Sequence, residues 1–224
     1  MSGPLHVLYE DNHVIAVVKP AGVLVQGDAS GERTLMDDIK DYLARKYDKP
    51  GAVFLGLVHR LDRRVAGVVV FGRTSKGAAR LSEQIRTRAV EKTYRAWVEG
   101  ALLGDSGELV CFMSSNDGYI TAHASAGPDR KEAKLGWRVL RREAARTLLE
   151  IDLHTGRKHQ IRVQLARAGH PILGDDRYGA HTSWVTPGIA LVSYRMKLKH
   201  PTKDEILTFE LPAALDPVSP KNQD

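Results

Sequence analysis

Residues 53–71 read VFLGLVHRLDRRVAGVVVF, in which two apolar runs flank the polar segment HRLDRR at 59–64. Short apolar runs are typical of buried strands, so we expect the polar segment to be a loop that the scaffold holds on both sides. Its single acid, Asp62, lies among three arginines that could hold an anionic ligand. From the residues alone, Asp62 is either half of a structural ion pair or a catalytic carboxylate, since both roles perturb a carboxyl group.

The composition of the chain fits one globular domain and excludes several other classes of protein. The 224 residues, 42% of them hydrophobic, are enough to form a real core. The single cysteine, Cys111, allows neither a disulfide framework nor a thiolate metal cluster. No apolar stretch approaches the roughly 20 residues that cross a bilayer, and the N-terminus lacks the order of a signal peptide. We therefore expect a cytoplasmic protein with no membrane partner.

The positive charge of the chain is concentrated in one stretch. Lysine and arginine number 33 against 27 acids, which gives a net charge of +6. Residues 60–95 hold ten basic and three acidic residues, a local charge of +7, so the rest of the chain is nearly neutral. Phosphate contacts dominate nucleic-acid affinity, so this stretch fits an RNA- or DNA-binding cleft. A solvated basic face would give the same pattern, and both interpretations stay open at this point.

Hydrophobic periodicity and turn residues predict a mixture of strands and helices. Apolar spacing predicts three helices, the first with a capping box of Thr34 and Asp37, over residues 34–47, 75–88 and 159–168. Apolar runs predict strands over residues 5–10, 13–18, 93–98, 134–140, 147–153, 189–198 and 206–211. Many strands interrupted by a few helices indicate one α+β domain, residues 1–211, with a mixed sheet. The tail that follows, residues 212–224, is expected to be disordered.

A second polar cluster, HTGRKHQIR at 154–162, follows a predicted strand and enters a helix. The free N–H groups of a helix N-terminus attract phosphate or carboxylate. Arg162 lies at the edge of the buried stripe of this helix, so it needs a carboxylate partner, and bidentate pairing is its best geometry. Asp62 is a natural candidate for that partner, and Asp175 or Asp176 is the alternative.

Histidines and acids around this cluster raise the question of a metal site. His154, His159 and His170, with Asp175 and Asp176, are residue types that bind metals. No pair of them has the i, i+4 spacing of a zinc-binding helix, and nothing in the sequence closes such a site. We therefore expect no metal.

Four ordered motifs resemble those of the RluA-type pseudouridine synthase family. They are HRLD at 59–62, EKTYRA at 91–96, TGRKHQIRV at 155–163 and GHPILGD at 169–175, with a similar hairpin ending in KPAG at 19–22. The similarity runs from about residue 5 to residue 211. We expect the chain to begin at the catalytic domain, without the small N-terminal RNA-binding domain of many members. The resemblance implies an α+β fold with a mixed, largely antiparallel sheet and a central RNA-binding cleft.

The resemblance also implies a reaction and the residues that carry it out. Family members convert uridine in RNA to pseudouridine without cofactor or metal, by breaking the N-glycosidic bond, turning the base and rejoining it through carbon. Asp62 matches the catalytic aspartate, Arg162 its positive partner, and Tyr94 the aromatic residue that stacks on the target base. Arg60 matches the side chain that fills the space left by the flipped nucleotide. From the residues alone, Tyr94 reads as a core residue on an alternating strand.

Structured RNA, either tRNA or ribosomal RNA, is the partner that these motifs imply. We expect a monomer that binds such RNA through its catalytic domain and does not bind DNA. The residues expected to contact RNA are Arg60, Arg63, Arg64, Lys92, Arg157, Lys158, His159 and Gln160.

The chain departs from the family pattern at one place. After the aspartate motif, the family has two variable residues and then Thr-Ser-Gly, whereas this chain has Val65, Ala66 and Gly67. Two hydroxyls that could shape the catalytic loop are therefore missing. The departure motivates a second hypothesis, a catalytically silent RNA-binding protein of the same fold. The conspicuous acid Asp62 motivates a third, a glycosidase that acts on nucleosides.

Overall fold

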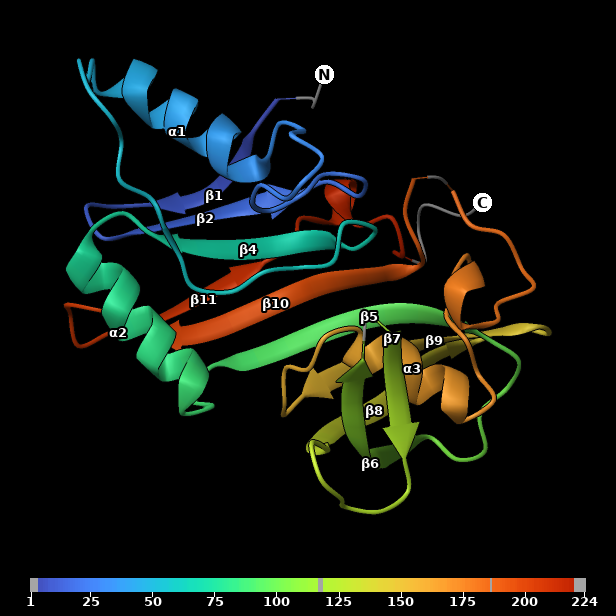
Figure 1. Ribbon diagram of the computed structural model, residues 1–224. Coiled ribbons are helices and arrows are strands. Elements are labelled where there is room, and N and C mark those ends of the chain that lie inside the picture. The colour runs from blue at the N-terminus through green and yellow to red at the C-terminus, as the bar shows by residue number, and fades with distance from the viewer. Residues whose placement is uncertain (1–3, 117–118, 186, 220–224) are drawn as a thin grey trace. The chain divides into compact units, whose positions relative to one another are not determined.

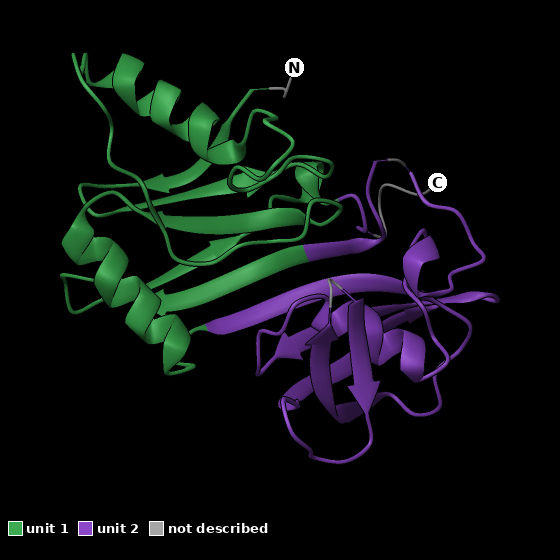
Figure 2. Cartoon of the chain, viewed as in Figure 1, with its two compact units in different colours: residues 1–90, 193–216 green, residues 91–192, 217–224 purple. Residues whose placement is uncertain are grey.

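The computed structural model describes residues 4–116, 119–185 and 187–219, and it divides into two compact units (Figure 2). Unit 1 comprises residues 1–90 and 193–216, and unit 2 comprises residues 91–192 and 217–224. The HRLD motif therefore belongs to unit 1, whereas the three later motifs belong to unit 2.

Unit 1 is built on a sheet whose central strands are continuous apolar runs of the sequence (Figure 1). Its strands are β1 (His6–Glu10), β2 (Val14–Lys19), β4 (Ala66–Gly72) and β10 (Leu191–Lys199), in that order, with β3 (Gly56–Leu57) on β4 and β11 (Ile206–Glu210) on β10. The pairs β1–β2, β2–β4, β3–β4 and β10–β11 are antiparallel. Every residue of β2 and β4 is buried, which explains why both read as continuous apolar segments.

Helices α1 (Leu35–Lys46) and α2 (Ser75–Arg86) complete unit 1. The Thr34 hydroxyl accepts a hydrogen bond from the Asp37 amide, and the Asp37 carboxylate accepts one from the Thr34 amide. This is the capping box that the sequence predicts at the start of α1. Helix α2 begins at Thr74, whose hydroxyl accepts a hydrogen bond from an amide of the first turn, and the helix packs against β4.

Unit 2 holds an antiparallel sheet in the order β5-β9-β8-β6-β7. Its strands are β5 (Glu91–Glu99), β6 (Ser106–Asn116), β7 (Tyr119–His123), β8 (Lys131–Arg142) and β9 (Arg146–Leu153). Helix α3 (Gln160–Arg167) packs against β6 and β7. Val163 of this helix packs with Cys111, Met113 and Ala133 in an apolar cluster, so the single cysteine is a buried core residue.

The α+β class with a mixed, largely antiparallel sheet is confirmed, and the three predicted helices form within two residues of their predicted ends. Sequence analysis missed the hairpin of β6 and β7. Those strands are only partly buried. Cys111 and Met113 alternate toward the core, as do Ile120 and Ala122, but polar residues occupy much of the rest of both strands and make this alternation short. The first apolar run was also longer than the strand it forms, since β3 has only two residues.

The structure corrects the prediction that the tail from residue 212 is disordered. It contains the 3-10 turn η2 (Ala213–Leu215), and Val218 is fully buried. The Val218 carbonyl accepts a hydrogen bond from the indole nitrogen of Trp97 at 3.1 Å. A terminal segment that docks an apolar side chain and a backbone acceptor in this way is ordered despite its prolines. The end of the predicted tail, residues 220–224, lies outside the described residues.

The sequence contains no apolar stretch that predicts a membrane-spanning helix, and the described helices can be compared with that prediction. None of them is both long and apolar enough to cross a bilayer.

Candidate active site

The polar segment between β3 and β4 forms a loop in which backbone hydrogen bonds fix Asp62. Its carboxylate oxygen Oδ1 accepts from the Arg64 amide at 3.1 Å, and its carbonyl accepts from the Val65 amide at 3.1 Å. A short acidic side chain that bonds to the backbone two residues further on shapes a turn by itself. The preceding residue, Leu61, is buried, whereas Asp62 is half-buried. The core therefore anchors the loop while the carboxylate keeps some contact with solvent.

Lys19, the last residue of β2, is completely buried and connects this loop to the turn that follows β2. Its ammonium donates to the carbonyls of Pro20, Val23 and Arg63 at 2.9, 2.8 and 3.0 Å. Each of the three N–H groups of an ammonium thus has one acceptor. Burial lowers the pKa of Lys19 to about 7, and the Asp62 carboxylate opposes that shift.

The three arginines of the loop have different surroundings. Arg63 donates to the Gly22 carbonyl at 2.9 Å and makes two hydrogen bonds to the Glu32 carboxylate, at 2.9 and 2.7 Å. Arg64 is half-buried, and Arg60 is exposed. The guanidinium of Arg63 therefore supports the loop within unit 1, whereas Arg60 is presented to solvent.

The two residues that depart from the family pattern, Val65 and Ala66, are both buried. They fill the core at the start of β4, and the loop hydrogen bonds donated by the Arg64 and Val65 amides do not involve the Val65 and Ala66 side chains. The next residue, Gly67, has a φ of +121°, and a Cβ at this position would lie 2.3 Å from the Ser193 carbonyl oxygen. A glycine is thus required where β4 and β10 approach each other.

In unit 2, strand β5 carries Tyr94 and Lys92. Tyr94 lies opposite Ile151 of β9 and is 7% exposed. Burial lowers the pKa of Lys92. A Cβ on Gly156 would lie 3.5 Å from Lys92 Nζ, so this amine is close to the turn of the second polar cluster. Unit 2 therefore brings two of the ordered motifs together.

A buried network of Thr155 and Gln160 holds the second polar cluster. The Thr155 hydroxyl donates to Gln160 Oε1 at 2.7 Å, and the same oxygen accepts from the Arg157 amide at 3.0 Å. Gln160 Nε2 donates to the Lys134 carbonyl at 3.1 Å and to Gln164 Oε1 at 3.0 Å. Both ends of the Gln160 amide are engaged inside unit 2. Although sequence analysis grouped Gln160 with the RNA contacts, its position is that of a support for the loop.

Arg162 of α3 makes a bidentate ion pair with Asp175. Its Nε and Nη2 donate to the two carboxylate oxygens at 2.6 Å each, and the two side chains are 4% and 0% exposed. Asp175, which the sequence offers as an alternative to Asp62, is therefore a carboxylate partner of Arg162 within unit 2. The bidentate pair occupies one edge of the guanidinium, and its Nη1 group lies on the other edge. The pairing of Arg162 with Asp62 stays a prediction.

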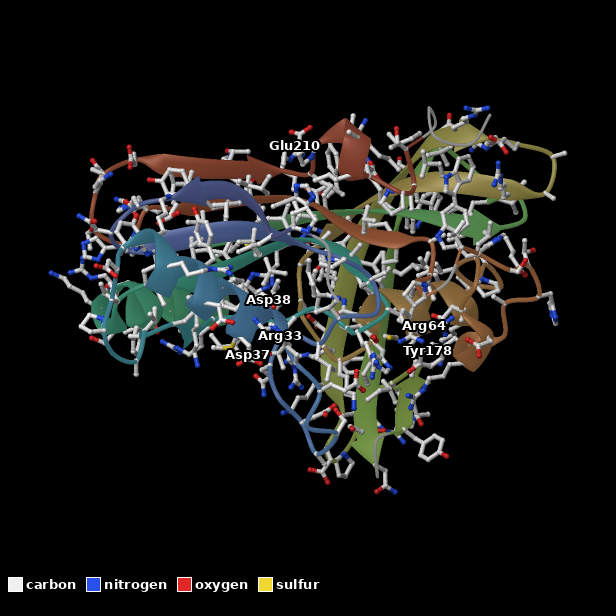
Figure 3. All side chains as sticks on the ribbon, turned by 90° about the horizontal axis from the view of Figure 1, so that it is seen from above. Arg33, Asp37, Asp38, Arg64, Tyr178 and Glu210 are labelled. Carbon is white, nitrogen blue, oxygen red and sulfur yellow. The ribbon has the colours of Figure 1, made fainter. Side chains whose placement is uncertain are left out.

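Tyr178, which is labelled in Figure 3, has its ring against the Arg162 guanidinium and its hydroxyl hydrogen-bonded to His159. The guanidinium carbon of Arg162 lies 4.8 Å from the Tyr178 ring centroid, and the phenol oxygen lies 2.7 Å from His159 Nδ1. His159 has a left-handed backbone with a φ of 55° and makes no side-chain cap bond to α3. Its ring is turned toward Tyr178 instead. Of its basic neighbours, Lys158 is exposed and Arg157 is half-buried.

Most of these residues belong to the sequence motifs, but Lys19 and Tyr178 have no role that the sequence predicts. Lys19 belongs to the KPAG turn, and the motif alone assigns it no role. A lysine directly after a continuous apolar run is the sequence feature that indicates a buried ammonium. Tyr178 had no distinguishing signal, because its contacts with His159 and Arg162 depend on the path of the chain after α3. Among the residues with described positions, no group of three His, Cys, Asp or Glu side chains is arranged to hold a metal ion.

Comparison with known proteins identifies a family for this arrangement. A family model described as RNA pseudouridylate synthase matches residues 13–167. The chain is 33% identical over 228 residues to ribosomal large subunit pseudouridine synthase D of Nitrosomonas europaea, covering 93% of this chain and 62% of that protein. It is 34% identical to an uncharacterized RNA pseudouridine synthase of Aquifex aeolicus, covering 93% of this chain and 69% of that protein. The chain thus spans about two thirds of the length of these relatives.

Solved structures give the same fold. Human RNA pseudouridylate synthase domain containing 4 superposes with a TM-score of 0.78 at 23% identity, covering 92% of this chain and 88% of that one. Human RNA pseudouridylate synthase domain containing 1 also gives 0.78, at 21% identity, covering 98% of this chain and 86% of that one.

Proposed function

Because the chain belongs to the RNA pseudouridylate synthase family, whose members are isomerases, we propose that it converts uridine in RNA to pseudouridine. In this reaction the bond from the ribose to N1 of uracil breaks, the base turns, and a new bond joins the ribose to C5. The proton of C5 leaves to solvent and N1 gains one, so atoms and charge balance without a redox step.

The observation that carries the proposal is the geometry of Asp62. Its carboxylate is half-buried in a loop that its own backbone bonds and the Lys19 ammonium hold in place. Attack on the sugar or base and abstraction of a ribose proton both need the ionised carboxylate, and both need it in a fixed position. A carboxylate held in one position by backbone hydrogen bonds suits either route.

Tyr94 and Arg162 have complementary roles in this proposal. We assign Tyr94 to stack on the target base and to transfer protons through its hydroxyl. We assign Arg162 to supply the positive charge that keeps the catalytic carboxylate ionised. The buried pair with Asp175 supports this role, since two hydrogen bonds of 2.6 Å fix the orientation of the guanidinium.

The proposed substrate is a structured RNA whose target uridine is flipped out of its stack. Flipping costs a few kcal/mol, which stacking and phosphate contacts offset. Arg60 is exposed on the Asp62 loop and is the side chain we assign to the vacated space, while Lys158 and Arg157 are assigned to phosphate. The names of the relatives point to large-subunit ribosomal RNA as the first substrate to test.

A catalytically silent RNA-binding protein of the same fold is the second candidate, because Val65 and Ala66 replace two hydroxyl residues. The burial of both side chains argues for activity, since hydroxyls at these positions would face the core rather than the substrate. The bonds that shape the turn, from the amides of Arg64 and Val65, do not depend on the missing hydroxyls.

Nucleoside analysis of treated RNA separates the candidates. Unmodified large-subunit ribosomal RNA and a pool of unmodified tRNA are each incubated with the purified full chain and then digested to nucleosides. Pseudouridine supports the proposal and identifies the RNA class. Unchanged uridine with retained RNA binding supports the silent protein, and released uracil supports a glycosidase.

A further inference from the structure

Tyr119 and Arg177 form an exposed pair beside the edge strand β7. Tyr119 is the first residue of β7 and is 74% exposed. Arg177 lies in the 3-10 turn η1 (Asp176–Tyr178), is exposed as well, and has its guanidinium carbon 6.0 Å from the Tyr119 ring centroid. A guanidinium and an aromatic ring at this distance attract each other. A ring with this exposure contributes little to the core of unit 2, so its surface is available to a ligand.

The pair is the outer end of a longer series of rings and cations. Arg177 also lies 5.9 Å from the ring centroid of Tyr178, and Arg162 lies 4.8 Å from that same centroid. Rings and guanidinium groups therefore follow one another from Tyr119 to Arg162. The inner end is fixed, because Arg162 is paired with Asp175 and Tyr178 packs against the apolar cluster that includes Val163 of α3. The outer end, at Tyr119, meets solvent.

Aromatic faces and guanidinium planes are the groups on which unpaired nucleobases stack. Arginine adds an attraction to the phosphates of the same strand. The surroundings favour RNA over an apolar protein partner. The Tyr178 hydroxyl bonds to His159, and the exposed ammonium of Lys158 is next in sequence.

We propose that Tyr119 and Arg177 form a stacking subsite for an unpaired base in the RNA next to the target uridine. This inference rests on the proposed function. A base on this subsite adds affinity without contacting the reacting atoms. Interactions that are equal in the ground state and the transition state lower KM and leave kcat unchanged. Loss of the subsite therefore raises KM and spares kcat.

Binding to two short RNA strands tests the subsite directly. One probe is an oligouridylate, and the other is a strand of equal length that carries the same ribose phosphates without bases. The wild-type full chain binds the oligouridylate more tightly, and Tyr119→Ala reduces that preference about tenfold. Tyr119→Phe retains the preference, because it keeps the ring. Arg177→Lys reduces it, because it keeps the charge but loses the plane.

Leu103→Ala is the matched control for Tyr119→Ala, since Leu103 is 95% exposed in the same unit and has no aromatic face. Its preference equals that of the wild type. An equal preference in the wild type and in Tyr119→Ala overturns the subsite. If Tyr119→Ala does not fold, photocrosslinking of the wild-type chain to a strand with 4-thiouridine decides the question. Adducts on Tyr119 or Arg177 support the subsite, and adducts elsewhere alone overturn it.

These measurements do not need turnover, so the two proposals can fail separately. A wild-type chain that forms no pseudouridine, yet prefers bases through Tyr119, refutes the proposed function and retains the subsite. A chain that forms pseudouridine, with a preference that Tyr119→Ala leaves unchanged, retains the function and refutes the subsite.

Discussion

At the scale of single residues, the buried pair of Arg162 and Asp175 is an electrostatic constraint within unit 2. Both side chains are almost inaccessible to solvent, and the pair is bidentate. Removing one partner leaves an uncompensated buried charge. We therefore expect Arg162→Ala to lower the free energy of unfolding by about 3–5 kcal/mol. Urea denaturation followed by circular dichroism measures this loss.

Arg86→Ala is the control for that prediction. Arg86 also makes two hydrogen bonds to one carboxylate, that of Glu83, but both side chains are largely exposed. Its removal is expected to cost less than about 1 kcal/mol. Equal and small losses in both variants would show that the buried pair has no special role in unit 2.

Lys19 makes the stability of the protein depend on pH. Its pKa is about 7 in the folded protein, against 10.5 for an ordinary lysine. Between these values the unfolded chain binds a proton that the folded chain does not, so stability rises with pH across this window. One proton corresponds to a slope of about 1.4 kcal/mol per pH unit. Stability that is present above pH 10.5 is therefore lost as the pH falls toward 7.

Lys19→Met isolates this effect, because methionine has similar length and no titrating group. The free energy of unfolding is measured for both proteins at several values of pH between about 7 and 10. We expect the wild type to gain stability relative to Lys19→Met as the pH rises. A difference between the two proteins that stays constant with pH would show that Lys19 titrates as an ordinary lysine.

At the scale of elements, the start of β4 connects the Asp62 loop to the sheet of unit 1. Gly67 has a positive φ, and a Cβ there would clash with the backbone of Ser193 on β10. We expect Gly67→Ala to destabilise the protein by at least about 1–3 kcal/mol. Because the displaced strand carries the Asp62 loop, pseudouridine formation falls as well. Thermal melting and a product assay measure the two effects.

Gly27→Ala provides the comparison, since a Cβ at Gly27 meets nothing within 4 Å and the residue has no positive φ. We expect its stability to remain within about 0.5 kcal/mol of the wild type. If Gly67→Ala melts at the same temperature as Gly27→Ala, the close approach of β4 and β10 does not constrain the loop.

The elements also show how far sequence reasoning extends. The α1 capping box and the apolar stripes of the helices are local, so their residues alone predict them. The hairpin of β6 and β7 shows only a short pattern of this kind, since two residues of each strand face the apolar cluster and most of the others are polar or exposed. The residues of the candidate site also fall into those that the sequence predicts and those that it does not. Motif residues were found by resemblance, whereas Lys19 and Tyr178 act through contacts that only the folded chain creates.

At the scale of the whole molecule, the charge distribution makes a prediction about RNA affinity. The net charge is +6. Of the basic side chains expected to contact RNA, Arg63 is paired with Glu32 and burial lowers the pKa of Lys92, which leaves Arg60, Arg64, Arg157 and Lys158 as the expected phosphate contacts. We assume that each of the four neutralises one phosphate of a single strand. A plot of log K for RNA binding against log salt concentration then has a slope of about −3. Lys158→Ala is expected to reduce the slope by about 0.7. Filter binding over a salt series measures both.

Arg45→Ala removes an exposed charge at the end of α1, outside the motifs, and serves as the control. Its slope should equal that of the wild type. Equal changes in Arg45→Ala and Lys158→Ala would indicate attraction to the overall charge of the protein rather than binding at the proposed contacts.

The central claim, that Asp62 is the catalytic group of an RNA pseudouridine synthase, is tested most directly by tritium release. RNA transcribed with uridine tritiated at C5 loses the label to water when C5 becomes the carbon bonded to ribose. Wild-type chain and Asp62→Asn are compared at equal RNA occupancy, determined by filter binding. We predict tritium release by the wild type and none by Asp62→Asn, with RNA affinity largely retained. Release at the wild-type rate by Asp62→Asn would contradict the account.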